Sequence, residues 1–99
     1  QMEGSAIFAL SAALWHEVEI VGGRVTQSNF DGAPLLTLAQ TPYIDVRLIE
    51  SDAPPGGAGE PGVPPVAPAL AAAIFAATGD RVRRLPVARA GYAVGSAVF

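Results

Sequence analysis

A glycine-rich loop in the second half of the chain holds the residue best suited to chemistry. The carboxyl side chain of Glu60 stands between Gly59 and Pro61, shortly before a segment with the pattern of an apolar helix. A carboxylate on a loop stiffened by proline could act as a general base. The alternative is an acid that only stabilises the start of the helix through the helix dipole. Taken alone, the residues favour this second, structural interpretation.

The same loop formally matches a dinucleotide-binding pattern. Its sequence Gly57-Ala58-Gly59-Glu60-Pro61-Gly62 is G-x-G-x-x-G and precedes a helix. That pattern should follow a strand directly, whereas residues 51–56 intervene here. Pro61 and Pro64 also lack the backbone N–H groups that would bind a pyrophosphate. Nucleotide binding therefore stays a distant alternative, and a Walker loop is excluded because the chain has no lysine.

The other polar residues are weaker candidates for catalysis or ligand binding. There is no cysteine and a single histidine, His16, so neither thiolate catalysis nor a multi-histidine metal site can form within the chain. Ser5 and Ser11 lack an evident base partner, which argues against a serine nucleophile. Arg81, Arg83 and Arg84 form a small basic cluster, but the net charge of −3 gives no electrostatic footprint for nucleic acid. We therefore expect no nucleic-acid partner.

Hydrophobic patterning predicts the elements that must position Glu60. Residues 3–15 and 66–78 are expected to be helices, the second closed by Gly79. Residues 17–29 are expected to be a β-hairpin turning at Gly22-Gly23, and residues 43–50 a third strand. A further short strand is expected over 82–87. The expected fold class is α+β, in the order α-β-β-β-α, with the hairpin and third strand packed by the two apolar helices.

Composition indicates that the chain is part of something larger, or an obligate subunit. Of its 99 residues, 51% are apolar and 15% are charged, against about 25% charged in a typical soluble domain. No residue from 4 to 15 is charged, and a helix that is apolar all round is buried on all sides. Such burial needs more protein than 99 residues supply.

The uncharged stretch 61–79 is not a membrane span, because its prolines leave only about half the required helix.

Three short segments, in order, resemble the molybdenum hydroxylases, the xanthine oxidase and aldehyde oxidoreductase family. Gln1-Met2-Glu3-Gly4 before an apolar helix resembles the Q-[VIM]-E-G segment of the family's large subunit. Residues 41–46 resemble its P-x-[IF]-x-V strand. Residues 57–61 resemble its late G-[VA]-G-E-P-P segment, with Gly62 in place of the last proline. The run 59–70 is most similar to isoquinoline 1-oxidoreductase β subunits and related bacterial aldehyde dehydrogenases.

The resemblance implies an assignment for each part of the chain. Residues 1–86 would be the C-terminal part of a molybdopterin-binding domain, while residues 87–99 are a tail without assignment. Glu60 would be the catalytic base in the hydroxylation of an N-heteroaromatic or the oxidation of an aldehyde with water as oxygen source. Gln1 and Gly59 would contact the cofactor, molybdenum-molybdopterin in a cytosine dinucleotide form, and no residue of this chain would bind the metal directly.

The resemblance also implies partners. They would be the remainder of the molybdopterin-binding subunit, an Fe–S subunit that takes up the electrons, and a small-molecule substrate. The isolated chain would then be inactive. No signal peptide is visible, so the compartment is not readable from the residues, and the resemblance slightly favours the periplasm over the cytoplasm. The competing hypothesis is a non-enzymatic interaction module whose apolar helices bind a partner chain.

Overall fold

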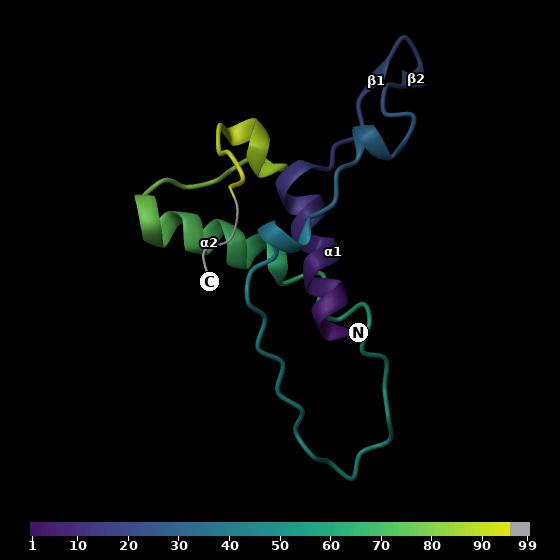
Figure 1. Cartoon of the computed structure of the whole chain (residues 1–99), viewed down its shortest axis with the longest axis vertical. Coiled ribbons are helices and arrows are strands. Elements are labelled where there is room, and N and C mark those ends of the chain that lie inside the picture. The colour runs from purple at the N-terminus through teal and green to yellow at the C-terminus, as the bar shows by residue number, and fades with distance from the viewer. Residues whose placement is uncertain (96–99) are drawn as a thin grey trace.

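Two crossing helices organise an open, elongated molecule (Figure 1). The computed structural model describes residues 1–95. The radius of gyration is 15.8 Å, whereas a compact chain of this length has about 13 Å. The accessible surface is 7675 Å², against about 5,300 Å² for a folded monomer of this mass. The chain therefore leaves far more surface uncovered than a self-sufficient globule does.

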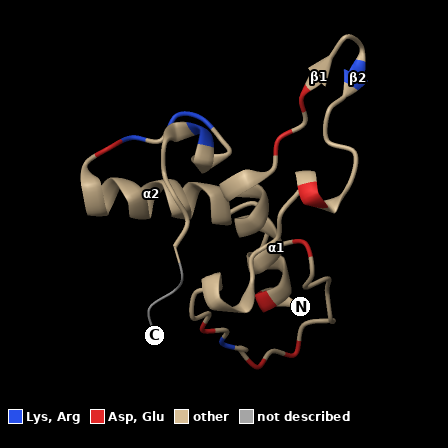
Figure 2. Cartoon of the chain, turned by 45° about the horizontal axis from the view of Figure 1, so that its top comes forward, with Lys and Arg blue, Asp and Glu red and all other residues tan. Residues whose placement is uncertain are grey.

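The first helix, α1, spans Met2–Trp15, one residue longer than predicted. Gln1 occupies its N-cap without a side-chain hydrogen bond, and the backbone becomes extended at His16. One side of α1 is buried, but Phe8 on the other side is 60% exposed. The chain alone covers one side of α1, so the expected burial on all sides would need further protein, as the composition indicates. Apart from Glu3, α1 carries no charged residue (Figure 2).

The second helix, α2, spans Val66–Thr78, as predicted. It ends because Gly79 adopts a left-handed backbone with φ of +81°, and the Gly79 N–H donates to the Phe75 carbonyl. α2 packs against α1, yet none of its own residues is fully buried. Its alanine-rich surface is thus mostly open to solvent.

A small hairpin is the only sheet within residues 1–95. Strands β1 (Ile20–Val21) and β2 (Arg24–Val25) pair antiparallel, with Ile20 opposite Val25. The predicted turn is confirmed, since Gly22 and Gly23 both have positive φ, of +58° and +78°. The predicted packing is wrong: the hairpin projects away from both helices, and all four strand residues are exposed (Figure 1).

The predicted third strand does not form a sheet. Residues 43–50 belong to a long loop without ladder hydrogen bonds, and Leu48 is 92% exposed. An alternating sequence makes a strand only where a neighbouring strand supplies hydrogen-bond partners, and the hairpin lies elsewhere.

The expected short strand over 82–87 is also absent; the chain passes through a cis Leu85–Pro86 bond into a 3₁₀ turn, Val87–Ala90. The structure is α+β, with two strands rather than three in its described part.

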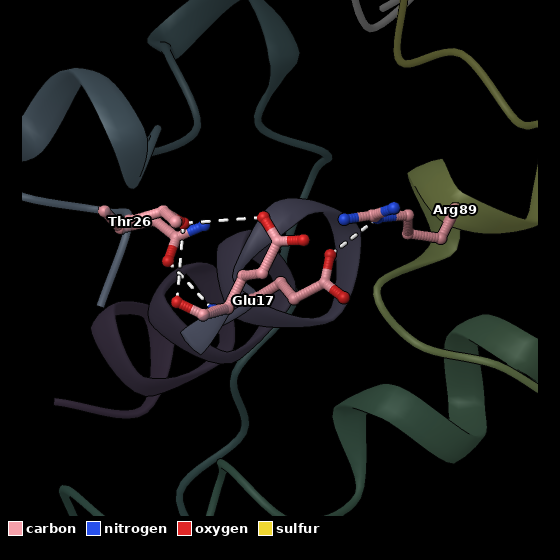
Figure 3. Close-up of polar contacts among 5 residues, drawn as sticks. Glu17, Thr26 and Arg89 are labelled. Atoms are coloured by element: carbon pink, nitrogen blue, oxygen red, sulfur yellow. Dashed lines mark hydrogen bonds and ion pairs between the residues drawn. The ribbon is translucent and has the colours of Figure 1, made fainter. Parts of the chain in front are cut away.

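Polar contacts tie the connecting segments to the end of α1. The Ser11 hydroxyl, fully buried, donates to the Ile7 carbonyl at 2.9 Å and accepts from the Leu36 N–H at 3.1 Å. Arg89 Nε lies 2.6 Å from Glu17 Oε2, just after the end of α1 (Figure 3). Two residues further on, the Glu19 carbonyl accepts a hydrogen bond from the Thr26 hydroxyl. The Ser11 and Arg89 contacts hold the segment near Leu36 and the C-terminal 3₁₀ turn to α1 and the residues just after it, whereas the Thr26–Glu19 bond closes the base of the hairpin. Among residues 1–95, neither helix has the length and apolar character needed to span a bilayer.

Candidate functional site

The N-terminal end of α1 meets the glycine-rich loop, although the two are far apart in the sequence. A Cβ atom placed on Gly59 would stand only 3.1 Å from the Oε1 atom of Gln1. Two of the three residues predicted to form a site are therefore brought together. The third, Glu60, is the immediate neighbour of Gly59.

A tight turn fixes the backbone around Glu60. The Val63 N–H donates to the Glu60 carbonyl at 2.9 Å, and the Val66 N–H donates to the Val63 carbonyl at 3.3 Å, which leads directly into α2. Gly62, inside this turn, is buried against Ser5 and Met2 of α1. The loop is thereby held between the two helices by a turn on one side and a close contact on the other.

The Glu60 side chain itself is exposed. Its Oε2 atom stands 3.9 Å from the position of a Cβ on Gly57, an ordinary contact distance. It forms no ion pair with any residue in the described part of the chain. A carboxylate presented in this way is free to accept a proton or a hydrogen bond from a group brought to it.

Beside the loop runs an open groove of about 590 Å³. Glu60 does not line it, but the loop residues on both sides do, including Ala58 and Pro61. The other walls come from α1 and the extended segment 44–48, and the apolar lining includes Met2, Ala6, Ile44, Val46 and Leu48. The sequence did not indicate that the extended segment 44–48 would form one wall of a groove. The alternation of Ile44, Val46 and Leu48 is the sequence signal for this wall, although alternation by itself predicts a paired strand.

The residues present can contact a cofactor but cannot hold a metal ion by themselves. Within residues 1–95, no group of three or more His, Cys, Asp or Glu side chains has the arrangement of a metal site. What the site does offer is the Gln1 amide, a glycine where a side chain would collide with that amide, and a free carboxylate. These groups can form hydrogen bonds to a polar organic cofactor, but they supply too few ligands for a bare metal ion.

A dinucleotide site has no support in this geometry. The loop 57–62 follows an irregular segment rather than a strand. The N-cap of α2 is Pro65, and its cap position offers neither a backbone N–H nor a capping side chain.

Comparison with known proteins gives consistent relatives. The chain is 41% identical over 87 residues to a protein named membrane-bound aldehyde dehydrogenase [pyrroloquinoline-quinone] from Gluconacetobacter polyoxogenes. It is 40% identical over 87 residues to the beta chain of isoquinoline 1-oxidoreductase from Brevundimonas diminuta. It is 39% identical over 88 residues to the B chain of nicotinate dehydrogenase from Pseudomonas putida. Each match covers 88% of this chain. This chain is homologous to part of the molybdenum hydroxylase large subunit.

The chain spans only 7–11% of the length of these three relatives. No protein-family model matches it, and no solved structure matches it significantly. The relatives are named as oxidoreductases or as their subunits, which disfavours an interaction module without enzymatic role. The resemblance noted in its short segments is thus confirmed at the level of the family.

Proposed function

We propose that this chain is the C-terminal part of a molybdenum hydroxylase large subunit and that it supplies the general base, Glu60. The observation that carries the proposal is the placement of Gln1, Gly59 and Glu60 at one end of α1, in a chain related to such subunits over 88% of its length. In this proposal residues 1–86 are the C-terminal part of the molybdopterin-binding domain, and the tail 87–99 has no assigned role. Residues 96–99 of that tail lie outside the described part of the structure.

The proposed cofactor is molybdenum bound to molybdopterin in its cytosine dinucleotide form. When bound, it supplies the two-electron oxidising power that the reaction needs. Gln1 would donate or accept hydrogen bonds to the cofactor through its side-chain amide. Gly59 would leave the space that the amide occupies, because any side chain there would stand against it. The metal itself has no ligand among the residues described here.

The proposed role of Glu60 is proton transfer. Its carboxylate accepts the proton of the water-derived nucleophile as that oxygen attacks an electrophilic carbon of the substrate. A base must keep its position to do this, and the turn between Glu60 and Val63 supplies that rigidity. The apolar groove walls beside the loop favour exclusion of water once the rest of the large subunit covers them.

The proposed substrates are N-heteroaromatic compounds or aldehydes. This range follows the names of the relatives, which include an isoquinoline oxidoreductase, a nicotinate dehydrogenase and an aldehyde dehydrogenase. The proposed partners are the remainder of the large subunit and an Fe–S subunit that accepts the electrons. The periplasm is the proposed compartment.

A second cofactor is favoured by one observation. The name of the aldehyde dehydrogenase from Gluconacetobacter polyoxogenes specifies pyrroloquinoline quinone. A quinone cofactor is therefore the second candidate, and a dehydrogenase that uses it does not require molybdenum. Elemental analysis of the purified native complex, together with extraction of any quinone, distinguishes the two cofactors directly.

The test of Glu60 is its replacement by glutamine in the full-length protein. Glu60→Gln keeps the shape of the side chain but removes the basic group, so turnover should fall by about 10²–10⁴-fold. Molybdenum content should remain that of the wild type. Glu50→Gln is the matched control, because Glu50 is also an exposed loop acid and does not line the groove. Wild-type turnover in Glu60→Gln would refute the assigned role.

A further inference from the structure

The glycine loop touches α1 at one point where two small residues interlock. We propose that Ser5 and Gly62 form a steric lock that positions Glu60, which makes Ser5 a positioning residue for the catalytic loop. The proposal rests on the proposed role of Glu60. It assigns a function to a serine that, as a nucleophile, had no base partner.

Ser5 is held rigidly on its side of the contact. It is only 7% exposed, its Oγ donates to the Met2 carbonyl at 2.8 Å, and its N–H donates to the Gln1 carbonyl at 3.0 Å. A side chain with its hydroxyl bonded to the preceding turn has one rotamer and cannot easily swing aside. Ser5 thus presents a fixed surface to the loop.

Gly62 has no room for a side chain on the other side. It is buried, and a Cβ atom placed on it would collide with Ser5 Oγ while standing 3.2 Å from Ser5 Cβ and 3.3 Å from Met2 Cε. Gly62 is not among the glycines with positive φ. Its backbone therefore suits any residue, and the need for glycine is purely one of space.

The contact between Ser5 and Gly62 affects the position of Glu60 because Gly62 and Glu60 belong to the same turn. Gly62 lies inside the turn that the Glu60 carbonyl and the Val63 N–H close at 2.9 Å. A residue that pushes Gly62 away from α1 must therefore shift or open the turn whose first residue is Glu60. A displacement of about 1 Å at a catalytic group is enough to reduce the rate by about 100-fold.

The steric origin of the lock allows a rescue experiment in the full-length holoenzyme. Gly62→Ala should lower kcat at least ten-fold while molybdenum content stays at the wild-type level. Ser5→Gly combined with Gly62→Ala should recover activity to within about three-fold of Ser5→Gly alone, because both Ser5 atoms are gone and only the flexible end of Met2 remains near the new methyl group. Ser5→Ala combined with Gly62→Ala should give partial recovery, since the contact at 3.2 Å remains. Gly56→Ala is the neutral control, as a Cβ on Gly56 meets nothing within 4 Å.

Two further readouts separate a positioning role from mere structural damage. The loss in Gly62→Ala should fall on kcat with KM unchanged, and the double variant of Ser5→Gly and Gly62→Ala should restore kcat. If Gly62→Ala yields no holoenzyme, recovery of holoenzyme in the double variant supports the lock. Unchanged kcat in Gly62→Ala, or no recovery in the double variant, overturns it.

The proposed role of Glu60 and the proposed contact between Ser5 and Gly62 can be refuted independently of each other. If Glu60→Gln keeps full turnover, the role of the base is lost. The collision between Ser5 and Gly62 is then still tested by thermal unfolding, where Gly62→Ala should lower Tm and Ser5→Gly in the double variant should restore it. If Glu60→Gln does abolish turnover but the double variant does not regain its Tm, the contact between Ser5 and Gly62 is refuted while the role of Glu60 stands.

Discussion

The side-chain oxygen of Gln1 lies where it would meet the first atom of any side chain at Gly59. The distance from Oε1 to that Cβ position is 3.1 Å, tighter than an ordinary contact. The first residue of the chain and the residue before Glu60 are thus fitted to each other across the end of α1.

This relationship predicts the effect of Gly59→Ala in the full-length enzyme. The new methyl group should displace the Gln1 amide and weaken its contact with the cofactor. Loss of a supporting polar contact at a metal centre typically costs about 10–100-fold in affinity. Molybdenum content of the purified protein, measured after dialysis, should fall well below that of Gly56→Ala, which adds its methyl group in open space. Equal metal content in the two variants would show that Gln1 makes no cofactor contact.

Ser11 offers a prediction about stability. Its buried hydroxyl accepts from the Leu36 N–H at 3.1 Å, so Ser11→Ala leaves that N–H without its partner. An unsatisfied buried group costs about 1–3 kcal/mol of unfolding free energy, and the half-buried Leu36 N–H should cost an amount near the lower end of that range. Denaturant unfolding of the full-length protein should detect this loss, with the exposed Ser28→Ala as control. A cost below that of the control would mean that water replaces the hydroxyl.

Gly79 is the residue at which helix α2 ends. Its φ of +81° disfavours every residue with a Cβ atom, and a Cβ placed there meets nothing within 4 Å. Gly79→Ala should therefore lower the free energy of unfolding by about 1 kcal/mol through backbone strain alone. Gly79→Asn should cost less, because asparagine tolerates this backbone better. Equal stabilities for the two variants would contradict a backbone origin.

The uncovered surface leads to a prediction about the 99-residue chain produced alone. Large apolar side chains stand open to solvent on α1 and on the long loop, among them Phe8, Tyr43, Leu48 and Ile49. Exposed apolar surface of this extent drives association. Sedimentation at micromolar concentration should show self-association, and a dye that binds apolar surface should fluoresce. A stable monomer that does not bind the dye would indicate that the chain covers this surface by itself.

Local physics explains the elements that the sequence predicted correctly. Helix α2 has the predicted bounds because it is rich in alanine and is closed by Gly79, and the hairpin turns where two adjacent glycines accept positive φ. Both depend on neighbours within a few residues. The short segments at residues 1–4, 41–46 and 57–61 likewise carry the family relationship without any structure, since homology is recorded in residue order.

The tertiary structure alone decided what these elements pack against. The alternation over residues 43–50 predicted a strand, but a strand exists only with a hydrogen-bond partner, and here the segment forms a groove wall instead. Glu60 could be picked out from the residues around it. The contact between the neighbouring Gly59 and Gln1, and the need for glycine at positions 59 and 62, came only from the way the loop folds back onto α1. Close packing between distant segments leaves no trace in local residue patterns, because it depends on which surfaces the whole chain brings together.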